Sequence, residues 1–294
     1  MKPRIIFFGS DKCSVFVLNQ LVNDSRFKLV GVATLEPKPK GRRGETAPNP
    51  VELYAKTLFE IKFFPLKKFN KKAVNQFKNL KADVGILAWY GKMLPKEILA
   101  LPKHGVLNVH PSLLPRYRGP SPVQAAIFNG DKQTGVTIFK MDEQMDHGPI
   151  LAQFKEEIKP DDTAESLYER LFTLGGQTLI SILPAYLKGK IAHRQQDHPK
   201  ATYTRRLTRD SGKIDWKTPD AEIERFIRAM HPWPGSWTRV KIPGYKDTRR
   251  LKILKAHLEK GQLVLDAVQL EGKKSVTWKQ FQQGYPKAKI IKSR

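Results

Sequence analysis

The stretch Arg4-Ile5-Ile6-Phe7-Phe8-Gly9 is a short apolar run that ends in glycine, and an amphipathic segment follows it directly. The same alternation of apolar runs and amphipathic segments continues to about residue 141. The expected strands are Arg4–Phe8, Lys28–Thr34, Ile61–Leu66, Val84–Trp89, Val106–Val109 and Val136–Met141. Strands that alternate with helices are typical of an open parallel sheet, so we predict an α/β fold.

Capping residues indicate where two of the helices begin. We expect Ser14 to cap the first helix, because serine is a favoured N-cap and the apolar residues that follow share one face. These apolar residues are Val15, Leu18, Leu21 and Val22. Asn49 is expected to cap a second helix, since Pro50 suits the first helical position.

A long basic loop is expected between Thr34 and Pro50. Prolines and glycines interrupt the regular pattern there, and the loop carries Lys38, Lys40, Arg42 and Arg43. Loops of this length in compact domains tend to be functional or disordered. Two interpretations stay open: the charges contact phosphate groups, or the loop is an excursion without a role.

The chain is strongly basic, and its last third is the most basic part. The formal net charge is +25, and residues 205–294 contain 22 Lys or Arg and 9 Asp or Glu, a net charge of +13. Such a surface attracts polyanions, with nucleic acid first among them, although a merely solvated surface is the alternative. Short alternating runs at Leu251–Ala256, Leu263–Val268 and Lys289–Ile291, separated by glycines, predict a small β-barrel here.

A length of 294 residues leaves room for two domains. A polar segment, Arg194–Lys200, follows the last helical pattern and resembles a linker. We therefore predict a catalytic domain over residues 1–189, a linker over 190–205 and a basic β-barrel domain over 206–294.

Several classes of protein and mechanism are disfavoured by what the sequence lacks. Cys13 is the only cysteine, so there is no internal disulfide or cysteine cluster for zinc, and we expect a small buried side chain. The segment after Gly9 lacks the later glycines of a dinucleotide fingerprint, and no P-loop, HExxH or GxSxG motif occurs. No apolar run suits a signal peptide or a membrane span, so a cytoplasmic protein is expected.

Asn108 and His110 lie at the end of a predicted strand, just before Pro111. Because side chains alternate along a strand, both should point to the same side. At the carboxyl end of a parallel strand, that side can face the crevice where such sheets bind ligands. An amide beside an imidazole could hold one carbonyl oxygen there, but a polar pair at a strand end is as often part of a turn. The residues alone leave both interpretations open.

Three motifs resemble those of the folate-dependent formyltransferases. The run from His110 to Gly119, followed by Pro120-Ser121-Pro122, is similar to the core motif of that family. Thr134–Thr137 and Met141–Gly148 resemble the second motif, which ends in a catalytic aspartate. Ile214-Asp215-Trp216 and Ile227–Trp237 are similar to the second domain of family members that act on tRNA. The resemblance covers nearly the whole chain.

This resemblance implies a fold, a site and a reaction. The implied fold is a Rossmann-like open parallel-sheet formyltransferase domain followed by an OB-like β-barrel. The implied catalytic residues are Asn108, His110 and Asp146, and the segment Ser112, Leu113, Leu114 and Pro115 is implied to lie against the folate. The co-substrate would be 10-formyltetrahydrofolate, without a metal. Asn108 and protonated His110 would stabilise the tetrahedral oxyanion, with Asp146 beside the imidazole.

The amine that accepts the formyl group is less closely defined. The candidates are initiator methionyl-tRNA, glycinamide ribonucleotide and a nucleotide-linked amino sugar, with a non-catalytic RNA-binding protein as the fourth alternative. The basic second domain and the loop residues Lys38, Lys40, Arg42 and Arg43 favour tRNA. Ser10-Asp11 and Pro149 depart from the usual pattern of the tRNA enzymes and leave the acceptor side in doubt. A monomer is expected from the family resemblance.

Overall fold

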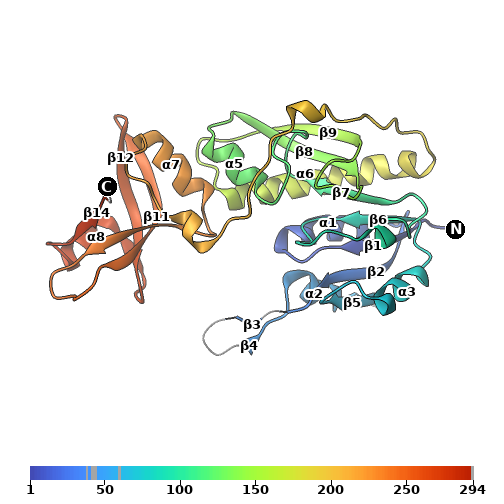
Figure 1. Ribbon diagram of the computed structural model, residues 1–294, viewed down its shortest axis with the longest axis horizontal. Coiled ribbons are helices and arrows are strands. Elements are labelled where there is room, and N and C mark those ends of the chain that lie inside the picture. The colour runs from blue at the N-terminus through green and yellow to red at the C-terminus, as the bar shows by residue number, and fades with distance from the viewer. Residues whose placement is uncertain (38, 41–44, 59–60, 293–294) are drawn as a thin grey trace. The chain divides into compact units, whose positions relative to one another are not determined.

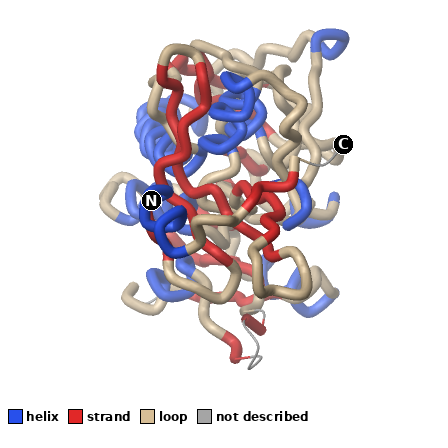
Figure 2. The backbone as a smooth tube through the Cα atoms, turned by 90° about the vertical axis from the view of Figure 1, so that its left-hand side faces the viewer, coloured by secondary structure: helices blue, strands red, loops and turns tan. Residues whose placement is uncertain are grey.

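The computed structural model describes residues 1–37, 39–40, 45–58 and 61–292. Two compact units are present, and each is described by itself. The first unit comprises Met1–Pro120, Thr134–Glu156 and Tyr168–Tyr203, and the second comprises Ser121–Gln133, Glu157–Leu167 and Thr204–Arg294. The elements are labelled in Figure 1, and the course of helices, strands and loops can be followed in Figure 2.

A seven-stranded sheet forms the centre of the first unit. Its strands, in spatial order, are β5 (Lys62–Leu66), β2 (Lys28–Leu35), β1 (Arg4–Phe8), β6 (Val84–Leu87), β7 (Val106–His110), β8 (Gln133–Lys140) and β9 (Ile150–Glu157). The pairs from β5 to β7 are parallel, which confirms the predicted parallel sheet for these five strands. β8 runs antiparallel to β7, a direction that an apolar run does not reveal.

The helices that accompany this sheet do not all begin at a side-chain cap. They are α1 (Lys12–Val22), α2 (Pro50–Ala55), α3 (Lys71–Lys78), α4 (Lys96–Leu99) and α6 (Ala164–Leu187). Asn49 caps α2 with Pro50 at its start, which confirms that prediction. The prediction for Ser14 was wrong, because Asp11 is the N-cap of α1. Ser14 instead accepts the backbone N–H of Asp11 at 3.1 Å, which completes a capping box.

Buried apolar side chains hold one face of the parallel strands against the helices. This cluster contains Ile6 and Phe8 from β1, Phe64 from β5 and Phe77 from α3. The ring of Phe77 meets those of Phe8 and Phe64 edge-on, with centroids 5.7 and 5.0 Å apart. Edge-to-face packing of this kind favours one fixed arrangement of strands and helix.

The basic loop contains a small hairpin. β3 (Pro39–Lys40) pairs antiparallel with β4 (Glu45–Thr46). Lys38, Arg42 and Arg43 lie outside the described residues.

The second unit has its own sheet and its own core. Five strands form the order β13 (Ser275–Thr277), β12 (Gln262–Leu270), β11 (Arg249–Glu259), β10 (Ser236–Lys241) and β14 (Lys289–Ile291), with every pair antiparallel. The helices are α5 (Pro122–Phe128), α7 (Asp220–Ala229) and α8 (Trp278–Gly284), with a 3-10 turn at Arg209–Gly212. The predicted β-rich second domain is confirmed, and its closure into an OB-like barrel stays a prediction.

The segment predicted to be a linker is hydrogen-bonded to the first unit. The backbone of Arg194 exchanges hydrogen bonds with Ile150, at 2.8 and 2.9 Å. Farther along, Thr202 accepts the N–H of Tyr117 through its hydroxyl at 2.8 Å. A 3-10 turn, His198–Lys200, lies between these two anchors. The division at residues 189 and 206 stays a prediction, but most of the intervening chain packs as part of the first unit.

Over the described residues, no helix is long and apolar enough to cross a membrane.

Candidate active site

The carboxyl end of β7 presents Asn108 and His110 on one side of the strand. Both side chains are buried, with 7% of Asn108 and 4% of His110 exposed. β7 lies between β6 and β8, and Asn108 is aligned with Leu87 on one neighbour and Phe139 on the other. A strand held on both sides fixes the direction of its side chains, so the amide and the imidazole are preorganised by the sheet.

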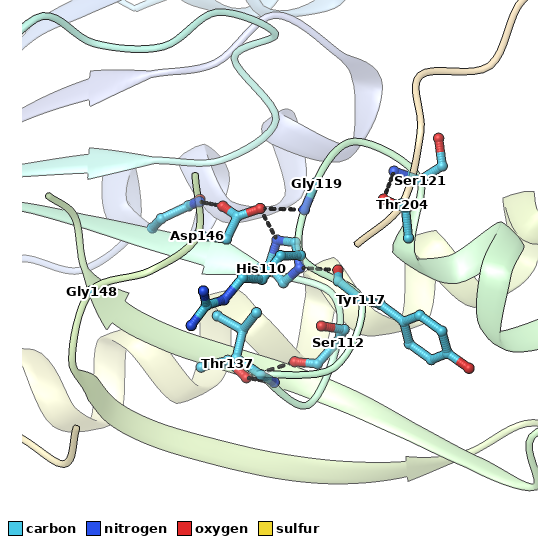
Figure 3. A network of polar contacts seen from close by, with 12 residues as sticks. His110, Ser112, Tyr117, Gly119, Ser121, Thr137, Asp146, Gly148 and Thr204 are labelled. Atoms are coloured by element: carbon cyan, nitrogen blue, oxygen red, sulfur yellow. Dashed lines mark hydrogen bonds and ion pairs between the residues drawn. The ribbon is translucent and has the colours of Figure 1, made fainter. Parts of the chain in front are cut away.

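Asp146 approaches the same place from the loop between β8 and β9. Its Oδ1 lies 3.5 Å from Asn108 Nδ2, and its Oδ2 lies 3.7 Å from His110 Nδ1. The backbone N–H of Gly119 donates to Oδ2 at 2.7 Å, so the carboxylate is anchored on its other side (Figure 3). The structure thus brings together the three residues predicted to be catalytic, although their catalytic role stays a prediction.

The hydrogen-bond partner of the second ring nitrogen of His110 shows which nitrogen carries a proton. His110 Nε2 lies 3.0 Å from the carbonyl oxygen of Tyr117, which can only accept a hydrogen bond (Figure 3). Nε2 is therefore the donor, and Nδ1 is the nitrogen that faces Asp146. When Nδ1 is also protonated, the ring becomes a cation whose Nδ1 lies 3.7 Å from a carboxylate oxygen.

The predicted folate segment divides into buried and accessible residues. Ser112 and Leu114 have at most 3% of their surface exposed, whereas Leu113 and Pro115 are partly exposed. Ser112 Oγ donates to the carbonyl of Arg116 at 2.6 Å. In this structure Ser112 and Leu114 therefore shape the segment from within, and only Leu113 and Pro115 offer surface to a ligand. Folate contact through this segment stays a prediction.

Thr137 on β8 holds this segment against the sheet. Its hydroxyl donates to the carbonyl of Ser112 at 2.6 Å and accepts the N–H of Leu114 at 3.2 Å (Figure 3). Gln153 on β9 adds a hydrogen bond from Nε2 to the carbonyl of Leu114 at 2.8 Å. Strands β8 and β9 thus fix the backbone that leads away from His110.

A cavity of about 440 Å³ opens beside the same segment. Its lining combines apolar and basic side chains from the first unit: Leu113, Ile150, Leu151, Ala152, Gln153, Lys155, Ala192 and Arg194. A pocket of this size with few polar groups suits a small organic ligand, and the two basic residues favour an acidic one.

A pair of histidines packs beside the Asp146 loop. His147 and His198 stack with their centroids 4.0 Å apart and their planes 4° from parallel. Asp142 Oδ2 lies 2.7 Å from His147 Nδ1, and Arg118 Nη2 lies 2.8 Å from His198 Nδ1. Burial, and then the charges of His147 and Arg118, hold the pKa of His198 below its usual value. His198 therefore serves as a neutral acceptor for Arg118.

Cys13 is buried, as expected, and burial raises the pKa of its thiol, which disfavours a nucleophilic thiolate. Among the residues that the structure describes, no three His, Cys, Asp or Glu side chains are grouped to hold a metal.

The sequence did not reveal how the three polar residues are fixed. The N–H of Gly119 and the carbonyl of Tyr117 are backbone groups, so no pattern of side chains in the sequence predicts these contacts. Together the site offers an amide and an imidazole, each within 4 Å of the carboxylate of Asp146. Such a set can bind a carbonyl oxygen, stabilise negative charge that develops on it and accept a proton.

Comparison with known proteins identifies relatives over most of the chain. Residues 3–183 match the family model described as "Formyl transferase", and residues 206–262 match "Formyl transferase, C-terminal domain". The chain is 46% identical to the methionyl-tRNA formyltransferase of Roseiflexus sp. (strain RS-1), covering 81% of this chain and 73% of that one. It is 36% identical to the enzyme of the same name from Methylacidiphilum infernorum (isolate V4), covering 96% and 95%.

A solved structure has a similar fold at low sequence identity. It is an N-formyltransferase from Helicobacter canadensis in complex with folinic acid and dTDP-3-aminofucose. The TM-score is 0.67 at 20% identity, and the match covers 94% of this chain and 99% of the other.

Proposed function

The chain belongs to the formyl transferase family, and we propose that it transfers the formyl group of 10-formyltetrahydrofolate to the amino group of methionine on initiator methionyl-tRNA. The observation that carries the proposal is the convergence of Asn108, His110 and Asp146 in a chain whose relatives carry that enzyme's name. The proposed reaction supplies formylated initiator tRNA for translation.

The three side chains suit each stage of a formyl transfer. The amine nitrogen attacks the formyl carbon, and the electron pair of the carbonyl bond moves onto oxygen. Asn108 Nδ2 and, when it carries a proton, His110 Nδ1 lie on the side of β7 that faces Asp146, and they can turn an N–H from the carboxylate toward this oxyanion. A single donor of this kind typically stabilises the transition state by about 3–4 kcal/mol. When the intermediate collapses, the bond to the folate nitrogen breaks, that nitrogen takes up the proton lost by the amine, and the formyl amide forms.

Asp146 is the acceptor for the proton that the amine must lose. Its Oδ2 is held by the N–H of Gly119 and lies 3.7 Å from His110 Nδ1. A carboxylate that both orients the imidazole and takes up a proton, directly or through water, contributes to the addition and the collapse. Asp146 is 13% exposed at its side chain, so a proton can leave the site through water.

The charge of the second unit supports a nucleic-acid acceptor. On β10 the exposed side chains of Arg239 and Lys241 alternate with buried ones. Arg239 is paired with Arg250 on β11, and Lys241 with Lys289 on β14. Residues that are directly paired across a sheet share a face, so four basic side chains lie on one face of this sheet. Like charges repel, and although Asp210 lies 3.6 Å from Arg250, a bound polyanion would lower the repulsion on this face further.

We assign the contact with the acceptor arm of the tRNA to the basic loop, through Lys38, Lys40, Arg42 and Arg43. The assignment follows from the charge of the loop, since phosphate contacts from lysine and arginine position a nucleic acid without reading its sequence. Exchanging Arg42 and Arg43 for alanine should lower kcat/KM for charged tRNA by about tenfold or more and weaken its salt dependence. Unchanged formylation in the double variant would refute the assignment.

The folate is proposed to lie beside the segment Ser112, Leu113, Leu114 and Pro115. Leu113 lines the neighbouring cavity, whose basic residues Lys155 and Arg194 suit the carboxylates of a folate. The segment begins two residues after His110, so a ligand along it ends near the three polar groups. We also propose that the chain acts in the cytoplasm, where translation starts; a monomer stays a prediction.

Three acceptors presented in parallel test the proposal. The full chain is incubated with 10-formyltetrahydrofolate and with charged initiator tRNA, glycinamide ribonucleotide or a 4-amino sugar nucleotide. We expect turnover on the charged tRNA and kcat/KM lower by at least about a hundredfold on the small acceptors. Turnover on a small acceptor alone would refute the tRNA assignment while keeping the family chemistry. Asn108→Ala retaining full activity would refute the mechanism.

A further inference from the structure

Gln196 connects the segment after α6 to the loop that carries Asp146. Its side chain is 5% exposed, whereas its neighbour Gln195 is exposed. Gln196 Nε2 donates to the carbonyl oxygen of Asp146 at 2.9 Å and to that of Gly148 at 2.8 Å. One amide group therefore holds the backbone at the aspartate and two residues beyond it.

Arg118 determines which way the Gln196 amide points. Arg118 is 2% exposed, and its Nη2 and Nε donate to Gln196 Oε1 at 2.7 and 3.2 Å. A guanidinium can only donate, so it selects the orientation in which the amide oxygen faces it. The amide nitrogen is then left to face the two carbonyls, which can only accept. The hydrogen-bond chemistry permits only this orientation.

The backbone that Gln196 holds is in a conformation that an aspartate rarely adopts. Asp146 has a φ of +48°, in the left-handed region that disfavours residues with a side chain. A Cβ at Gly148 would lie 1.9 Å from the carbonyl oxygen of Lys140, so the loop packs tightly on β8. Residues in such a conformation persist when their surroundings hold them. The two hydrogen bonds from Gln196 supply that restraint on one side, and the Gly119 N–H supplies it on the other.

We propose that Gln196 is a positioning residue for the proposed formyl transfer, which sets the place of the Asp146 carboxylate through the backbone on either side of it. Arg118 acts one step farther away, by orienting the Gln196 amide. The segment 190–205 therefore supports the active site through the backbone of the Asp146 loop. None of its residues contacts Asn108 or His110 among the contacts that the structure describes. The inference rests on the proposed function, and its test includes a measurement that does not depend on activity.

A double-mutant cycle with Asp146 separates positioning from general stability. Gln196→Glu keeps the volume and the acceptor for Arg118 but places an oxygen against the two carbonyls. We expect kcat to fall on the order of 10- to 100-fold with KM for the folate within about twofold, because small displacements of a catalytic group have effects of this size. In the Asp146→Asn background the same change should lower kcat less than about twofold. Gln195→Glu, at the exposed neighbour, is the matched control and should behave as wild type.

Two further measurements keep the inference open to refutation. Gln196→Met, which adds no charge, should give the same cycle if Gln196→Glu does not fold. Hydrogen exchange followed by mass spectrometry should show faster exchange at Gly119 and across residues 143–149 in both Gln196 variants, with β1 unchanged. Equal losses in the wild-type and Asp146→Asn backgrounds, or unchanged exchange in this loop, would overturn the inference. If the wild-type chain formylates no acceptor, the proposed function is refuted. The exchange measurement alone would then show whether Gln196 restrains the backbone of the Asp146 loop.

Discussion

Asp146→Asn tests the electrostatic part of the mechanism most sharply. The substitution preserves the shape of the side chain, but it removes the charge that lies 3.7 Å from His110 Nδ1. At an effective dielectric constant of about 20, two unit charges at this distance attract by about 4 kcal/mol. That energy stabilises positive charge on the imidazole in the transition state. Its loss corresponds to a decrease in kcat of about a thousandfold.

The assay compares this variant with a matched carboxylate elsewhere in the first unit. Asp24 pairs with Arg26 and is similarly buried, with 11% of its side chain exposed against 13% for Asp146. Single-turnover formylation with saturating folate should show the full loss in Asp146→Asn, with kcat of Asp24→Asn within about twofold of wild type. Binding of folate should be nearly unchanged in both variants. If Asp146→Asn keeps more than about a tenth of the wild-type kcat, the electrostatic argument is refuted.

Three other substitutions test the surroundings of the site. Thr137→Val leaves backbone groups of residues 112–115 without their buried partner, so unfolding in urea should show a loss of about 2–3 kcal/mol; an unchanged midpoint would contradict this. The pKa of His198 is lowered in the folded protein, so stability should be full above pH 6.5 and fall as the pH drops through the folded pKa. As the pH is lowered, the melting temperature of His198→Asn should fall less than that of wild type. Parallel plots of melting temperature against pH for the two proteins would refute this. Gly148→Ala forces its Cβ against a β8 carbonyl and should lower kcat about tenfold or more, whereas Gly284→Ala, with open space around it, should not; equal activity of the two would refute this.

Six strands of the seven-stranded sheet could be predicted because each is an apolar run with the length and flanking residues of a strand, whereas β9 was not predicted. Alternation along β7 correctly placed Asn108 and His110 on one side. The direction of β8 could not be predicted, since an apolar run has the same composition in a parallel and an antiparallel pair. The N-cap of α1 was misplaced because Asp11 and Ser14 both have capping side chains, and only the structure shows that they cap reciprocally.

The candidate site was predictable in part. Asp146 came from the motif resemblance, because its distance in sequence from His110 hides their contact. Gln196 lies in a polar segment that resembles a linker, and nothing in that pattern distinguishes it from exposed Gln195. Its partners are backbone carbonyls of the Asp146 loop, and folding alone brings these carbonyls within reach of the Gln196 side chain.

The transfer itself can be tested by following the formyl group from the folate to the amino acid. Wild-type chain is given 10-formyltetrahydrofolate with a ¹³C-labelled formyl carbon and initiator tRNA charged with methionine. The tRNA is then deacylated and the released amino acid is analysed by mass spectrometry. We expect wild type to form N-formylmethionine that carries the label, and Asp146→Asn to form it about a thousandfold more slowly. If only unmodified methionine is released after prolonged incubation with intact 10-formyltetrahydrofolate, the proposed formyl transfer is contradicted.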